Sequence, residues 1–181
     1  ELFSVANRIG NYYEARGIGR NDRVALLSNN SIEHLAIYLG SLAYGCTIAT
    51  IHIEMNASYF EEILNAVNAK IVFCEAGQPV LDALAGKVPG DWHVLGDWQA
   101  DGGPSASSGA FAMFAEYDDT VGGWPLAGRM DNASIFNTSG TSSRPKGVLG
   151  TYAELTDNTL PIADGFGMTS EDRVLDYRSM N

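Results

Sequence analysis

The sequence predicts an α/β fold, with a mainly parallel sheet and flanking helices, from three observations. Short apolar runs that suit buried strands recur along the first half of the chain. Stretches with apolar residues at helical spacing alternate with these runs, and turn-forming residues separate the two. Strands that alternate with helices of this length are joined by right-handed crossovers, so neighbouring strands run parallel.

The first half of the chain is expected to supply most of the elements. In chain order they are a helix from Leu2 that stops at Gly17, a strand at 24–27, a helix that ends at Gly45, a strand at 47–53, a helix at about 59–67 and a strand at 71–74. Asn30 is expected to cap the second helix, because Glu33 follows three residues later in a capping-box-like pattern. A Gly/Ser/Ala/Asp/Pro tract at 96–109 predicts a flexible surface connection, and a weak helix is expected at 110–117.

Composition limits the classes of partner. The chain has 181 residues, 45% of them apolar, which is enough for one sizeable core. Its formal charge of -11 argues against nucleic acid as a partner, since phosphate contacts draw on clustered Lys and Arg. Between residues 71 and 128 the only basic residue is Lys87, against eight acidic ones, so the excess negative charge is concentrated there. Any phosphate site must therefore be local.

Cysteine and histidine positions predict neither a metal centre nor a hydrolase. Cys46 and Cys74 lie in apolar runs without a CxxC pair, so they are expected to be buried, reduced side chains. No GxSxG motif accompanies His34, His52 or His93, which are expected to be structural or surface residues. No apolar stretch approaches the length of a membrane span, and no secretory signal is visible, so a cytoplasmic location is expected.

One segment carries residue types suited to phosphate binding. An apolar strand at 134–137 leads into a loop that leaves through Val148 and Leu149. The loop's glycines, Gly140 and Gly147, permit positive φ and close backbone approach, and Lys146 supplies a positive charge. Hydroxyl donors come from Thr138, Ser139, Thr141, Ser142 and Ser143. The spacing excludes a Walker A loop, because Pro145 precedes Lys146. An ordinary Ser/Gly turn is the alternative for such a tract alone.

The whole string from Thr138 to Val148 resembles the phosphate-loop signature of the adenylate-forming (AMP-binding) superfamily, which includes acyl- and aryl-CoA synthetases. Similar family segments cover residues 17–29, 36–45 and 170–175, the last resembling a strand that follows the loop. There are two departures. The family has Thr-Gly where this chain has Ser142-Ser143, and often a His-rich stretch at 150–152. A positive φ at Ser143 would cost about 1 kcal/mol or more.

The resemblance implies a function for this loop. It implies an ATP-dependent carboxylic acid–CoA ligase, which forms an acyl-adenylate and then a thioester with coenzyme A. ATP, Mg²⁺ and coenzyme A would be its cofactors, and a small fatty or aromatic carboxylic acid its substrate. The loop at 138–147 would bind the β- and γ-phosphates through Thr138, Ser139, Gly140, Thr141, Ser142, Ser143, Lys146 and Gly147, with Lys146 stabilising the leaving pyrophosphate. No metal ligand is assigned.

The resemblance also implies that residues 1–181 are the front part of a large N-terminal domain, without the C-terminal domain. Such a fragment is expected not to complete adenylation alone, and its exposed apolar edges are expected to favour association of copies. Two alternatives stay open. One is a non-catalytic nucleotide-binding or interaction module. The other is a fragment of an adenylation domain that loads the thiol of a carrier protein.

Overall fold

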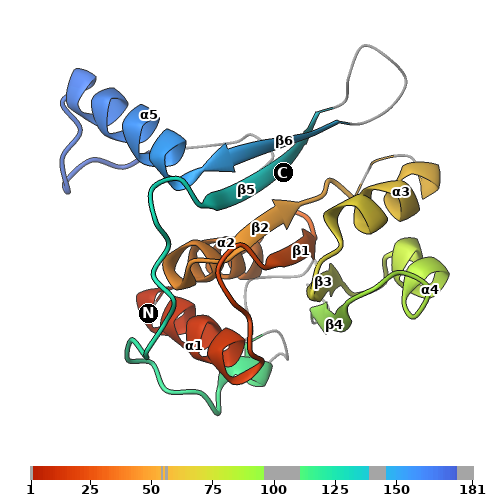
Figure 1. Ribbon diagram of the computed structural model, residues 1–181. Helices are drawn as coiled ribbons and strands as arrows, with labels where there is room; N and C mark the ends of the chain where they lie inside the picture. Colours follow the sequence, from red (N-terminus) through yellow and green to blue (C-terminus); the bar gives the residue numbers. More distant parts are fainter. Residues whose placement is uncertain (1, 54, 56, 96–110, 139–145, 175–181) are drawn as a thin grey trace.

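The computed structural model describes residues 2–53, 55, 57–95, 111–138 and 146–174 (Figure 1). Its strands are β1 (Arg23–Leu27), β2 (Thr47–Thr50), β3 (Ile71–Glu75), β4 (Asp91–Leu95), β5 (Asn132–Thr138) and β6 (Lys146–Thr151). Its helices are α1 (Leu2–Ala15), α2 (Ile32–Tyr44), α3 (Ala57–Val67), α4 (Pro79–Leu84) and α5 (Tyr152–Gly165), with a 3₁₀ turn η1 (Ala112–Phe114).

The strands form one sheet in the order β4-β3-β1-β2-β5-β6. Every neighbouring pair from β4 to β5 is parallel, and only β6 runs antiparallel, as the partner of β5. The predicted α/β fold with a mainly parallel sheet is therefore confirmed. The β5–β6 hairpin was not predicted as a pair of strands, because β6 contains two glycines and no apolar run longer than two residues.

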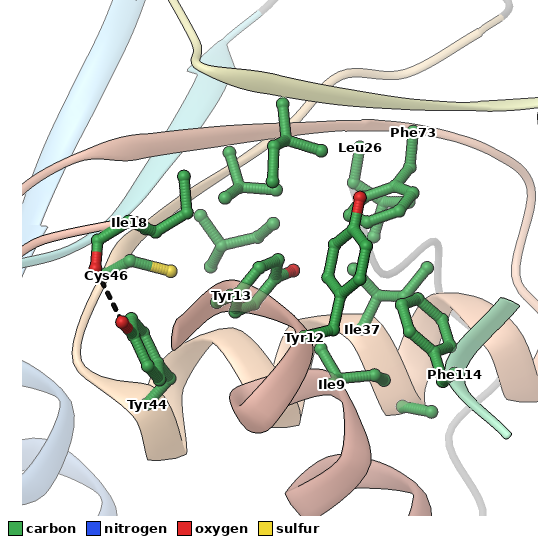
Figure 2. Close-up of a cluster of buried hydrophobic side chains, with 14 of the residues drawn as sticks. Ile9, Tyr12, Tyr13, Ile18, Leu26, Ile37, Tyr44, Cys46, Phe73 and Phe114 are labelled. Carbon is green, nitrogen blue, oxygen red and sulfur yellow. Dashed lines mark hydrogen bonds between the residues drawn. The ribbon is translucent and has the colours of Figure 1, made fainter. Parts of the chain in front are cut away.

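Alternation along the strands produces two hydrophobic clusters, one on each face of the sheet. Val24 and Leu26 of β1 belong to the cluster under α1 and α2, whereas Ala25 and Leu27 belong to the cluster under α3 and α4. Figure 2 shows the first cluster, in which the rings of Tyr12 and Tyr13 point from α1 toward the sheet. The core is thus a three-layer arrangement with helices on both faces.

Helices α1 and α2 approach each other closely at a glycine of α2. A Cβ atom on Gly40 would lie 2.9 Å from Cβ of Ile9, which is shorter than a van der Waals contact. Ile9 itself is fully buried. The missing side chain at Gly40 is therefore what allows α1 to pack this near to α2.

Several predicted boundaries differ from the structure. Ser31, and not Asn30, caps α2, because its side chain accepts a hydrogen bond from the backbone N–H of His34 at 3.0 Å. β2 ends at Thr50, short of the predicted residue 53, because the N–H of Met55 bonds back to His52 and turns the chain.

Toward the C-terminal side, two further predictions differ. Within 111–117 only the 3₁₀ turn η1 forms in place of the weak helix. Residues 170–174, which resemble a family strand, form a turn and an irregular segment without strand pairing. The connection predicted at 96–109 lies outside the described residues.

The predicted roles of the cysteines agree with the structure. Cys46 and Cys74 are buried and not disulfide-bonded. Burial raises the pKa of each thiol to about 12, which keeps both protonated at neutral pH. His34 is also buried, with Nδ1 2.9 Å from Oγ of Ser28, so its role is structural as expected. Among the described residues, no helix is both long enough and apolar enough for a membrane crossing.

Candidate phosphate-binding site

The predicted phosphate loop is the connection of the β5–β6 hairpin. Thr138, the last residue of β5, pairs in the antiparallel ladder with Lys146, the first residue of β6. Asn137 pairs with Gly147 one position further from the loop. Of the predicted site residues, Thr138, Lys146 and Gly147 therefore lie together at the base of the hairpin. Outside the described residues lie Ser139, Gly140, Thr141, Ser142 and Ser143.

The hairpin base lies at the carboxyl edge of the parallel sheet, where α/β proteins generally bind their ligands. β5 pairs in parallel with β2, whose last residue is Thr50. The side-chain Nδ2 of Asn137 donates a hydrogen bond to the backbone oxygen of Thr50 at 3.2 Å. This bond connects the strand before the loop to the end of the neighbouring strand. This hydrogen bond was not predicted, because no local sequence pattern indicates a contact between residues 50 and 137.

The structure gives a different reason for glycine at position 147 from the one expected. It lies in β6, and its φ is not in the positive range that the sequence analysis allowed for it. A Cβ atom there would lie 3.3 Å from Cγ2 of Ile135, which is a tight contact. Close packing within the hairpin therefore accounts for glycine at this position. Lys146 beside it is exposed, as a charge for a polyphosphate should be.

The opposite end of β6 is attached to the body of the domain. Tyr152 begins α5, and its hydroxyl donates to the backbone oxygens of Leu42 at 3.0 Å and Cys46 at 3.1 Å. Thr151 and Glu154 form a reciprocal capping box around this junction. The spacing Thr-x-x-Glu was visible in the sequence and could have predicted the start of α5.

The part of the chain after the hairpin exposes apolar side chains. α5 has no buried residue. Val148 and Leu149 of β6 are each 50% exposed, and Leu160 and Phe166 are more exposed still. In Figure 1, α5 extends from the end of β6 away from the other helices. Association of copies through these side chains stays a prediction.

The donor set at the hairpin suits an anion. Lys146 and the hydroxyl-bearing residues provide donors, and the segment 138–147 contains no carboxylate. Across the described ranges, no three His, Cys, Asp or Glu side chains are grouped closely enough to hold a metal ion.

Comparison with known proteins identifies the family. Residues 1–180 match the family described as AMP-binding enzyme. The chain belongs to the AMP-binding enzyme family. The resemblance of the loop and its surroundings to adenylate-forming enzymes is thereby confirmed.

Individual members of the AMP-binding family align along nearly the whole chain. A long-chain-fatty-acid–CoA ligase of Mycobacterium tuberculosis is 29% identical over 178 residues, covering 97% of this chain and 33% of the ligase. A 3-hydroxybenzoate–CoA ligase of an Aromatoleum species is 28% identical over 176 residues, with coverage of 96% and 33%. The chain thus spans about a third of the length of these relatives.

Solved structures of AMP-binding enzymes have the same fold. The crystal structure of ATP-bound MatB from Rhodopseudomonas palustris superposes with a TM-score of 0.79 at 27% identity, covering 93% of this chain and 32% of MatB. The architecture of this sheet with its flanking helices is therefore that of the front part of an AMP-binding enzyme.

Proposed function

We propose that residues 1–181 are part of an ATP-dependent carboxylic acid–CoA ligase. The observation that carries the proposal is the hairpin of an AMP-binding family chain, which holds Lys146 opposite Thr138 at the carboxyl edge of a parallel sheet. Support also comes from relatives that are named as ligases of fatty acids and of 3-hydroxybenzoate. A fatty or aromatic carboxylic acid is the corresponding substrate class.

In the first step an oxygen of the substrate carboxylate attacks the α-phosphorus of ATP. A bond forms between that oxygen and phosphorus, the bond from phosphorus to the bridging oxygen breaks, and the electron pair leaves with pyrophosphate. The departing group gains negative charge, which the ammonium of Lys146 stabilises together with the hydroxyl groups of Thr138, Ser139, Thr141 and Ser142 and the loop N–H groups. The loop residues therefore position and stabilise the leaving group.

Two further components belong to the proposal. Mg²⁺ would be held mainly by phosphate oxygens of ATP, since segment 138–147 has no carboxylate to offer it. In the second step the thiol of coenzyme A would lose its proton to solvent and its sulfur would attack the acyl carbon of the adenylate. The bond from that carbon to the AMP oxygen would break, and AMP would leave as the thioester forms. We assign no residue of this chain to the second step.

ATP–pyrophosphate exchange with a panel of acids tests the proposal. The assay compares the full product of the gene that encodes residues 1–181 with the 181-residue chain alone. The full product is expected to catalyse exchange that depends on an added carboxylic acid, and the 181-residue chain is not. Exchange by the short chain at the rate of the full product would contradict the expected incompleteness. Absence of exchange from both, with every acid, would favour a non-catalytic module.

A thiol-consumption assay identifies the acceptor. Loss of the free thiol of coenzyme A in the presence of ATP and the preferred acid is the expected result. Acid-dependent exchange without consumption of coenzyme A would instead favour an adenylation domain that loads a carrier protein.

A further inference from the structure

A small cavity of about 160 Å³ lies at the carboxyl edge of the sheet, beside β1, β3 and β4. It is lined by residues 28–31, which connect β1 to α2, by Glu33 of α2, by Glu75 at the end of β3 and by Leu95 at the end of β4. None of these residues belongs to the phosphate loop at 138–147. The cavity is therefore a second place at which the sheet edge can hold a ligand.

The position of this cavity in the fold favours ligand binding. From β1 the chain continues to β2 on one side of β1, and β3 then returns to the other side. The crevice outside the carboxyl ends of the strands at such a reversal is the usual ligand site of open α/β sheets. β2 lies between β1 and β5, so this reversal is distinct from the base of the β5–β6 hairpin.

The lining of the cavity is negatively charged. Neither Glu33 nor Glu75 forms an ion pair within the part of the chain that the structure describes. His34 bonds to Ser28 through Nδ1, and it stays uncharged at neutral pH because burial lowers its pKa. The amino end of α2 contributes roughly half a positive charge, which the two carboxylates outweigh. The complement of this lining is a cation.

The two carboxylates differ in how far their hydrogen-bonding capacity is used. Oε2 of Glu75 accepts a hydrogen bond from the backbone N–H of Asn29 at 2.7 Å, which fixes the carboxylate beside the β1–α2 connection. Oε2 of Glu33 is buried and has no hydrogen-bond partner among the described residues. A buried acceptor without a donor costs free energy, so a ligand that brings N–H donors is favoured.

We propose that this cavity binds the ammonium group of a short primary amine. The three N–H donors of the ammonium would reach Glu33, Glu75 and an oxygen of the β1–α2 connection. The buried side chain of Leu95 would contact the first carbons of the alkyl chain. A metal ion fits less well, because the described residues contain no group of three His, Cys, Asp or Glu side chains that could hold one. The proposal stands independently of the ligase activity.

NMR titration of the 181-residue chain, followed through its backbone amide signals, tests the class of ligand. Propylammonium, propan-1-ol and propanoate share an alkyl chain and differ in the head group. Propylammonium is expected to shift the amide signal of Asn29, with a dissociation constant on the order of a millimolar, as suits so small a ligand. The other two are expected to bind at least about tenfold more weakly. Equal binding of the alcohol, tighter binding of propanoate or of Ca²⁺, or no saturable shift with propylammonium would overturn the proposal.

Variants locate the binding site. Glu33→Gln and Glu75→Gln keep the shape of the side chain and remove its charge, so each is expected to weaken propylammonium binding at least about tenfold. Glu61→Gln is the matched control, because Glu61 is exposed on α3 and outside the cavity. The dispersion of the amide signals verifies that each variant is folded, and if one of the two is not, the other decides. Undiminished binding to a folded Glu33→Gln or Glu75→Gln chain, or an equal loss in Glu61→Gln, would contradict the assignment.

Discussion

Thr138 and Lys146 face each other across the last rung of the β5–β6 ladder, so the proposed phosphate loop is closed at its base by paired strands. This pairing fixes the position at which the lysine leaves the sheet. Asn137, one residue before Thr138, adds a side-chain hydrogen bond to the end of β2. The backbone at Lys146 is therefore held by the paired strands, an arrangement that would lower the entropy cost of the phosphate binding proposed above.

Replacing Asn137 by alanine should destabilise the base of the β5–β6 hairpin. Loss of the bond to Thr50 is expected to lower the free energy of unfolding by about 1 kcal/mol. Urea denaturation measures the change. Asn158→Ala is the matched control, since Asn158 is exposed on α5, where alanine favours the helix. An equal loss of stability in both variants would show that the Asn137 bond contributes nothing of its own.

The contact between α1 and α2 predicts a strong effect at Gly40. Gly40→Ala would place a Cβ atom 2.9 Å from Cβ of Ile9, so the helices must separate, at a cost of about 1–3 kcal/mol. Gly165→Ala, where a Cβ meets nothing within 4 Å, should be neutral or stabilising. Thermal unfolding of both variants checks the difference. A stabilised Gly40→Ala protein would be incompatible with the close packing.

His34 predicts a dependence of stability on pH. Burial lowers its pKa, because the charged imidazolium loses its hydration in the core. The unfolded chain therefore binds the proton more strongly than the folded protein does. The stabilisation of the folded protein by neutral, buried His34 is complete above the unfolded pKa of about 6.5. It is lost as the pH falls from there through the lowered pKa of the folded protein.

Urea denaturation at pH 7.5 and pH 5.5 checks whether the free energy of unfolding falls with pH as predicted for His34. The unfolding free energy of the wild-type chain should fall more between the two pH values than that of His34→Gln, which has no imidazole to protonate. Equal decreases in both proteins would exclude a role for His34.

The strand–helix order was predictable because each buried strand and amphipathic helix has a local pattern. Val24–Leu27 is apolar throughout, and the apolar positions of α3 recur at helical spacing. β6 has no such pattern in its own sequence. It forms a strand because its backbone pairs with that of β5. The cap of α2 was misplaced by one residue because Asn30 and Ser31 are both capable caps, and only the backbone geometry decides between them.

For the candidate site, residue types identified the loop and its lysine. Contacts between distant segments could not be predicted in this way. The bond from Asn137 to Thr50 and those from Tyr152 to Leu42 and Cys46 join residues that are 87 to 110 positions apart. Such contacts form only when the sheet is assembled. They fix the position of the hairpin, which the local sequence does not determine.

Pyrophosphate binding is the most direct test of the phosphate site. Calorimetric titration compares the wild-type chain with Lys146→Met and with Lys87→Met, a control that removes an exposed lysine outside the hairpin. Lys146→Met is expected to weaken pyrophosphate binding about tenfold or more, because a charge-assisted contact is lost, and Lys87→Met should bind as the wild type does. Equal affinity of Lys146→Met and the wild-type chain for pyrophosphate would contradict the assignment of the loop at 138–147.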